Sequence, residues 1–459
     1  MTALASPPRG RVRPGAAAGL SWRATGLAAA GLLLTFAAPQ HRVDLLLIGL
    51  ACLLGGVVWS PPSGPLLVGA TLPFFFFGRP LVGPLAVTPP GLTLLVSWVA
   101  AVARHRRLGL RWPRTAYDAP LALFLVAALL SLLVTDYPLL SVRELRAVIF
   151  EPILFFWFLH VMPGSAGWAV RGFLVGATVT AVAAIAQGPL GVGGTATEGV
   201  LRAQAWYPSA NHLALMLGRA WPFLVAGGLA GTAWLWLPAA LVGLALVLTF
   251  STGGWLGGLA GALVVVAALS HRRLALRWGA AAVLALVVVS GLAIGGVLPE
   301  RLNPLRQTGG FRLDLWLSSL DMLRDHPLLG IGLDNFAYLY QQVYLRPGAA
   351  AEPNLSHPHN WLLQFWLDLG LLGLVSFGWL VWRFAREVRR NLPLGAANRP
   401  WMIAGALGAM ADLLVHGLID NSYFLVDLAF VFWLTLAIVE PRPRAPDAGR
   451  VPDGSGVGE

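Results

Sequence analysis

The sequence contains no lysine, a single cysteine and few charged residues of either sign. Of its 459 residues, 12% are charged and 57% are hydrophobic, and the mean hydropathy is +0.70. Soluble domains carry about 25% charged residues. This composition therefore excludes an ordinary soluble domain and predicts an integral membrane protein. Cys52, the single cysteine, lies in an apolar run, which excludes a disulfide framework and a thiolate metal site.

Because lysine is absent, the formal net charge of +11 comes from arginine alone. The arginines cluster between apolar runs, which indicates membrane orientation and argues against a nucleic-acid partner. Metal-binding motifs are also missing: the chain has neither Asp-x-Asp nor His-x-x-x-His. Asp321 and Asp325 are four residues apart and could hold a divalent ion, pair with Arg324 or face solvent. We expect no metal and no cofactor.

Apolar segments dominate what is present, and many approach the ~20 residues that cross a bilayer. They predict an all-α, polytopic membrane protein with about 12–14 transmembrane helices. The expected spans are 24–38, 43–59, 64–78, 90–103, 119–135, 143–162, 168–187, 211–229, 233–250, 254–270, 276–297, 360–384, 400–418 and 421–439.

Arginine positions predict the orientation of these spans. With the N-terminus inside, fourteen crossings place every dense arginine cluster in the cytoplasm, as the positive-inside bias requires. The expected divisions are a basic cytoplasmic tail (1–23), eleven spans (24–297), a large external loop (298–359), three spans (360–440) and a disordered cytoplasmic tail (441–459).

The external loop carries arginines against this bias, and anion binding is one reason for that. We expect two short helices in it, around a glycine turn, lying on the membrane face. Gly309-Gly310 opens the first, His326-Pro327 closes it and Asp334 caps the second. Arg312 and Trp316 share one helical face; they form either an anion contact or an interfacial anchor.

A second group surrounds residues 202–219. Arg202 precedes "WYPSANHLALMLGRAWP", in which Asn211 opens a span as a binding residue or as a helix cap. Arg219 lies inside that span, where a charge marks a functional candidate or a structural pair. The available partners are Glu144, Glu151, Asp368, Asp412 and Asp420.

The stretch "SHPHNWLLQFWLDLGLLG" (356–373) places two histidines around a proline before an apolar run. Pro358 favours an extended His357, outside the helix, where its pKa should be ordinary. It also places His359 and Asn360 in the first helical turn. The helix dipole then keeps the His359 ring neutral and attracts an anionic donor to the same end. His359 is thus a candidate general base, with a plain capping residue as the alternative.

From Arg202 onward, the chain resembles the O-antigen ligase and polymerase-like family of bacterial membrane glycosyltransferases. The resemblance lies in "YPSANHLA", "FRLDLW", "HPLLGIGLDNF", "HPHNWLLQFWLDLGLLGL" and "HGLID", in that order. The family carries Ser-Arg-Gly where this chain has Ser251-Thr252-Gly253-Gly254, so one expected arginine is missing at Thr252.

The resemblance implies a metal-independent transferase in the bacterial cytoplasmic membrane. It would move a glycan from a polyprenyl-pyrophosphate carrier to a hydroxyl of a glycan, lipid or protein acceptor, on the outer side of the bilayer. Arg202 and Arg312 would bind the pyrophosphate, His359 would activate the acceptor, and Asn360 would orient the imidazole or the sugar. His357, Asn211 and Arg219 complete the expected substrate-binding residues. The alternatives are a polymerase that uses a second lipid-linked glycan, and a lipid-linked glycan flippase.

Overall fold

The computed structural model describes residues 19–440 with some gaps. Left out are 83–84, 106–113, 163, 198–199, 298–308, 351–352 and 393–399, and the stretch 270–297 is described in part. The described chain is helical apart from two short antiparallel hairpins, so the prediction of an all-α membrane protein is confirmed. The tail 441–459, most of the tail 1–23 and much of the expected span 276–297 lie outside the described residues.

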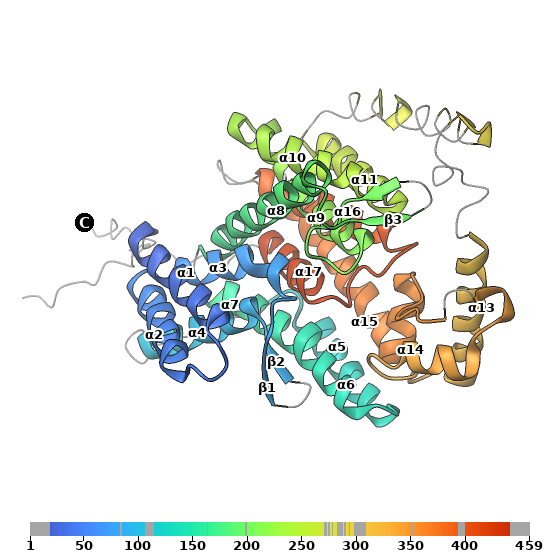
Figure 1. The fold of residues 1–459 in the computed structure, drawn as a ribbon, viewed down its shortest axis with the longest axis horizontal. Coiled ribbons are helices and arrows are strands. Elements are labelled where there is room, and N and C mark those ends of the chain that lie inside the picture. Colours follow the sequence, from blue (N-terminus) through green and yellow to red (C-terminus); the bar gives the residue numbers. More distant parts are fainter. Residues whose placement is uncertain are drawn as a thin grey trace, which may run out of the picture.

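The first helices pack together at one side of the molecule (Figure 1). They are α1 (Trp22–Ala37), α2 (Val43–Trp59), α3 (Ser63–Thr71), the 3₁₀ turn η1 (Leu72–Phe74) and α4 (Pro89–His105). The hairpin of β1 (Arg79–Val82) and β2 (Leu85–Val87) precedes α4. Glycine permits the close approach of α1 and α2, because a Cβ at Gly31 would lie 2.5 Å from the Gly49 carbonyl oxygen.

The next segments lead to the centre of the molecule. They are α5 (Asp118–Leu130) with η2 (Ser131–Leu133), α6 (Pro138–Glu144), a π-helical segment (Leu145–Phe150), α7 (Glu151–Val161), α8 (Ser165–Leu190), and the hairpin of β3 (Thr195–Thr197) and β4 (Val200–Arg202). Then follow α9 (Ala210–Leu229), η4 (Ala233–Leu235), α10 (Trp236–Leu248) and α11 (Thr252–Ala268).

The expected external loop contains α13 (Gly309–Asp325) and α14 (Phe336–Leu339), the latter continued by a π-helical turn (Tyr340–Tyr344) and followed by η7 (Pro347–Ala349). The predicted start and end of the first loop helix are confirmed. The predicted cap of the second is wrong: Asn335 occupies the N-cap position, and Asp334 has a left-handed backbone (φ 59°) and pairs with Arg143.

The last helices are α15 (Trp361–Asn391), α16 (Pro400–His416) and α17 (Val426–Val439). Helix α15 is broken at Gly370, whose φ of 70° and ψ of −177° are not helical. The backbone of residues 328–331 fills the break: Leu371 N–H donates to the Leu328 carbonyl, and Ile331 N–H donates to the Leu367 carbonyl. Backbone hydrogen bonds therefore fix the loop that carries α13 and α14 within the break of α15.

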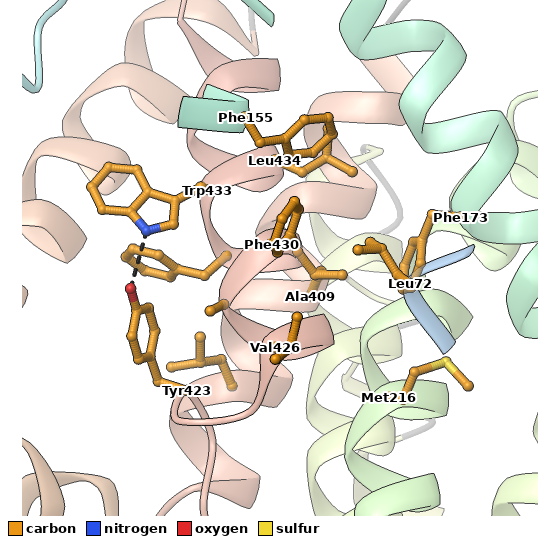
Figure 2. Packing of buried hydrophobic residues seen from close by; sticks show 14 of the residues in the cluster. Leu72, Phe155, Phe173, Met216, Ala409, Tyr423, Val426, Phe430, Trp433 and Leu434 are labelled. Atoms are coloured by element: carbon orange, nitrogen blue, oxygen red, sulfur yellow. Dashed lines mark hydrogen bonds between the residues drawn. The ribbon is translucent and has the colours of Figure 1, made fainter. Parts of the chain in front are cut away.

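The main hydrophobic core surrounds α17, against which α7, α9, α15 and α16 pack. Pro152 has no N–H to donate to the Val148 carbonyl, which a regular helix would require. The hydroxyl of Tyr423 donates to that carbonyl instead, at 3.0 Å, and the indole of Trp433 donates to the Tyr423 oxygen (Figure 2). This pair fixes the loop between α16 and α17 inside the core.

Every expected span that lies within the described residues overlaps a helix, and the match at α2 is complete. Three described helices are long and apolar enough to cross a membrane by themselves: α8, α9 and α15. The other apolar helices have 10–17 residues. The positions of the apolar helices therefore follow the hydropathy of the sequence, and the number of crossings stays a prediction.

Candidate active site

A histidine and a carboxylate from distant parts of the chain meet beside the start of α15. The Nδ1 of His359 lies 2.9 Å from Oδ1 of Asp420, which belongs to the loop between α16 and α17. Asp420 is 2% exposed, and the His359 side chain is 17% exposed. With Nδ1–H donating to the carboxylate, Nε2 carries the free lone pair. No described residue forms a hydrogen bond with Nε2, so this nitrogen is available to a substrate.

The segment before α15 positions His359 in a way that the sequence did not predict. His359 precedes the helix and has a left-handed backbone, with φ of 48°. Asn360 is the N-cap: its Oδ1 accepts from Leu362 N–H and Leu363 N–H. Trp361 N–H donates to the Gly417 carbonyl. The placement of His359 in the first turn is wrong, and so is the anion site expected there, because its amides are already paired.

Asn360 also links the two halves of the site. Its Nδ2 donates to the Leu418 carbonyl at 3.0 Å, in the loop that holds Asp420. The amide thus serves as a cap and as a clamp between the two segments. Its expected contact with a sugar remains a prediction.

His357 is more enclosed than the sequence suggested, with 7% exposure. Its Nδ1 lies 2.9 Å from the Ser356 hydroxyl, and its Nε2 lies 3.4 Å from Oδ1 of Asp420. Burial, followed by the charge of His359, lowers the pKa of His357 to about 4, and Asp420 opposes the shift only in part. The expectation of an ordinary pKa is therefore wrong, because Pro358 turns this ring inward.

Asp420 is held as an anion by its neighbours. Burial acts to raise its pKa, but the charge of His359 and hydrogen bonds from both histidines outweigh it and hold the pKa well below its usual range. The N–H of Asn421 also donates to Oδ1 at 2.8 Å. A fixed, ionised carboxylate of this kind sets the tautomer of the histidine that it binds.

Two further histidines enclose the site. The ring of His212, at the start of α9, lies 6.2 Å from the ring of His357. His416, the last residue of α16, is fully buried, and its Nε2 lies 3.9 Å from Oδ2 of Asp420. This distance is too long for a hydrogen bond. Neither ring nitrogen of His416 has a hydrogen-bond partner among the described residues.

Arg312 lies on α13 next to this cluster. Trp316, one turn further, donates its indole N–H to the Pro358 carbonyl at 3.1 Å, between the two histidines. Arg312 is close enough to His416 for its charge to act on that ring. No described residue forms an ion pair or hydrogen bond with its guanidinium. Its partly exposed cation at the edge of the site favours anion binding over the anchor alternative.

Arg202 is buried at the neighbouring helix ends. Its Nε donates to the Thr249 carbonyl at 2.7 Å, and its Nη2 donates to Oδ1 of Asn211 at 2.5 Å. Asn211 is not the cap of α9, since Ser209 accepts from His212 N–H. Arg202 also lines an apolar cavity of about 250 Å³ between α8, the β3–β4 hairpin and the end of α10. Arg202 therefore places a positive charge at the boundary of this apolar cavity.

Arg219 lies deeper, within α9. It donates to the Asp412 carboxylate and to the backbone and hydroxyl oxygens of Ser422. Gly218 and Gly257 leave room for the Asp412 carboxylate, which a Cβ at either position would meet. The pair is almost fully buried, so the structural alternative accounts for Arg219, and a substrate contact remains only a prediction.

One set of described residues has the arrangement of metal ligands. His357, His359 and Asp420 each offer one ligand atom, and these atoms lie within 4.8 Å of one another. The sequence did not predict this set, because its members do not form a metal-binding motif of short spacing. Asp420 lies 61 residues after His359. Asp321 and Asp325, the pair considered from sequence, instead contact Arg346 and the Tyr344 hydroxyl.

Sequence reasoning also missed Asp420 as a member of the site. The sequence offered Asp420 only as one of several possible ion-pair partners for Arg219. The loop reverses after α16 and turns the carboxylate toward α15, and periodicity does not reveal that turn.

Comparison with known proteins bears on this region. Residues 237–378 match the family described as O-antigen ligase; this stretch includes Arg312, His357 and His359. A Rickettsia conorii protein named "Putative polysaccharide ligase" is 29% identical over 94 residues, which cover 20% of this chain and 23% of that protein. A protein of the same name from Rickettsia typhi is 30% identical over 94 residues, which again cover 20% of this chain and 23% of that protein. The chain thus spans about a quarter of these relatives. The predicted resemblance to the O-antigen ligase family is confirmed for residues 237–378.

Proposed function

We propose that this protein transfers a glycan from a polyprenyl-pyrophosphate carrier to an acceptor hydroxyl at the outer face of the bacterial cytoplasmic membrane. The observation that carries the proposal is the His359–Asp420 pair, which leaves one imidazole nitrogen free among the described residues. Arg312 lies on the helix that contacts the same segment through Trp316, and its charge reaches His416 of this cluster. The match to the O-antigen ligase family supports the reaction class, and the apolar helices support the lipid setting.

His359 supplies the base. The acceptor hydroxyl gives its proton to Nε2 while its oxygen attacks the anomeric carbon of the glycan. The bond between that carbon and the pyrophosphate oxygen breaks, and the carrier leaves as polyprenyl pyrophosphate. Asp420 stabilises the imidazolium that forms.

Arginine stabilises the leaving group. Pyrophosphate gains negative charge as the bond breaks, and a guanidinium fork stabilises it through charge-assisted hydrogen bonds. Arg312 is the direct contact, because its head is unpaired among the described residues. Arg202 contributes charge at the edge of the apolar cavity, which suits a carrier with a lipid tail. The arrangement requires no metal, and turnover should survive a chelator.

The test is glycan transfer by the purified protein with a labelled polyprenyl-pyrophosphate glycan and a panel of glycan, lipid and protein acceptors. We expect transfer and equimolar release of polyprenyl pyrophosphate. Asp420→Asn should lower the rate by ~10²–10⁴, whereas His326→Ala, a change at an exposed loop histidine, should leave it unchanged. Movement of the intact lipid across vesicles without bond cleavage would identify a flippase instead. Loss of all activity with EDTA, restored by Mg²⁺, would contradict the arginine-based mechanism.

A further inference from the structure

The two histidines around Pro358 and the carboxylate of Asp420 bring three ligand atoms within 4.8 Å of one another. The Nδ1 of His359 and the Nε2 of His357 lie 2.9 and 3.4 Å from Oδ1 of Asp420. We propose that His357, His359 and Asp420 bind a divalent transition-metal ion, of which Zn²⁺ is the best match, and that the bound ion inhibits the enzyme. The binding site stands on geometry alone, whereas the inhibition rests on the proposed function.

The separations suit a tetrahedral ion. Zinc binds imidazole nitrogen and carboxylate oxygen at ~2.0–2.2 Å, so two ligands at a tetrahedral angle lie ~3.4 Å apart. The His357–Asp420 distance already has this value. The His359–Asp420 distance has to widen by roughly half an ångström for zinc, which a small rotation of the partly exposed imidazole provides. Two imidazoles and a carboxylate are ligands that zinc prefers over magnesium or calcium.

The surroundings are those of a supported metal site. The Ser356 hydroxyl contacts the far nitrogen of His357 and can accept its proton once Nε2 binds the ion. His416 lies 3.9 Å from the second oxygen of Asp420 and has no hydrogen-bond partner among the described residues. His416 lies outside the set of three ligand atoms, so a water molecule takes the fourth position.

Metal binding would invert the tautomer of His359. The ion takes the Nδ1 lone pair, and the proton that Nδ1 donated to Asp420 moves to Nε2. The ring stays neutral, but Nε2 now carries hydrogen and accepts no proton from the acceptor hydroxyl. The ion therefore blocks the base without touching the donor glycan.

The binding test uses the full-length protein in detergent and metal-free buffer, titrated with Zn²⁺ by calorimetry. We expect one tight site per chain, with the affinity reduced at least tenfold in His357→Ala and Asp420→Asn. The matched control His326→Ala changes an exposed histidine of the same loop and should bind as the wild type does. X-ray absorption of the wild-type complex should show at least two imidazole ligands, which needs no variant to fold. Equal affinity in all variants, or a zinc shell without imidazole, would overturn the site.

The inhibition is tested separately. Zn²⁺ should stop glycan transfer by the wild type and by His326→Ala, and EDTA should restore it. Tight binding without loss of transfer would overturn the inhibitory role. Tight binding by a protein that transfers no glycan would contradict the proposed function and leave the metal site standing. Glycan transfer by a protein that does not bind zinc would support the proposed function and overturn the metal site.

Discussion

Four of the nine histidines gather around one carboxylate, and the chemistry of the site depends on which ring faces outward. His357 and His416 are buried, whereas His212 and His359 are partly exposed. All four are neighbours of Asp420. His359 is the candidate base because it combines partial exposure with a direct hydrogen bond to the Asp420 carboxylate.

The first prediction separates His359 from His357. His359→Ala should reach the membrane in normal amounts but lose ~10²–10⁴ in transfer rate, as expected for a missing general base. His357→Ala should keep substantial activity, because its ring points into the protein. The measurement is glycan transfer by purified variants at matched protein levels. Wild-type turnover by His359→Ala would show that His359 is not the general base. Loss of transfer in His357→Ala but not in His359→Ala would assign the base to His357.

The second prediction concerns the two arginines. A lysine cannot replace a guanidinium that makes two directed hydrogen bonds. Arg202→Lys should therefore lower both the melting temperature and activity, because it loses the link between Thr249 and Asn211. Arg312→Lys should lower activity and leave the melting temperature unchanged.

Arg324→Lys is the control, as Arg324 is exposed at the end of the same helix. Thermal unfolding and initial rates measured together distinguish the cases. Full activity of Arg312→Lys would show that Arg312 does not bind the leaving group.

The third prediction is a pH dependence of stability that arises from His357. Its pKa of about 4 in the folded state lies below the ~6.5 of an unfolded histidine. The unfolded state binds more protons between these values, so stability is complete above pH ~6.5 and falls as the pH drops toward 4. The loss amounts to roughly 3 kcal/mol. Asp420, with its lowered pKa, adds no loss until the pH is below ~4.

The measurement is the melting temperature between pH 7.5 and 4.5. His357→Gln should flatten the profile, although the other buried histidines leave part of the slope. An unchanged slope in this variant would contradict the buried, neutral His357.

At the scale of elements, the break in α15 holds the loop that carries α13 and α14 to the helix bundle. Gly370 has a positive φ, and a Cβ there would lie 2.4 Å from the Leu328 carbonyl oxygen. Gly370→Ala should therefore destabilise the protein by more than ~1 kcal/mol, through strain and displacement of the loop. Gly378→Ala, in the same helix, meets nothing within 4 Å and should be neutral or stabilising.

Melting temperature and protease sensitivity of the loop check this prediction. Equal stability of the two variants would show that the loop does not depend on the break.

The elements also show how far sequence reasoning reaches. Apolar runs predicted the helices because burial in lipid or protein requires hydrophobic length. They did not predict the break at Gly370, because a glycine inside an apolar run gives no sign of the loop that fills the gap. Proline rules predicted that His357 is extended, but they did not reveal that Asn360 is the cap or that Asp420 lies opposite. Those contacts join segments about 60 residues apart, which local pattern does not encode.

At the scale of the whole molecule, the candidate site and the arginine-rich end of α15 lie at opposite ends of the same helix. Positive-inside bias then predicts that the site is external. With Cys52 replaced by alanine, Arg324→Cys should react with an impermeant maleimide in intact spheroplasts. Arg389→Cys, exposed at the other end of α15, should react only after lysis. The opposite result would invert the topology and place the base in the cytoplasm, away from the proposed acceptor.

The position of Asp420 between α16 and α17 has a consequence for biosynthesis. A nascent chain inserted as far as α15 contains His359, but it lacks Asp420 and the Gly417 and Leu418 carbonyls that hold the start of α15. Only when the last two described helices enter the bundle does Tyr423 close onto Val148 and bring Asp420 to the imidazole. Under the proposed function, molecules that lack α16 and α17 would therefore be inert toward lipid-linked glycans, and only chains inserted past this point would consume the carrier.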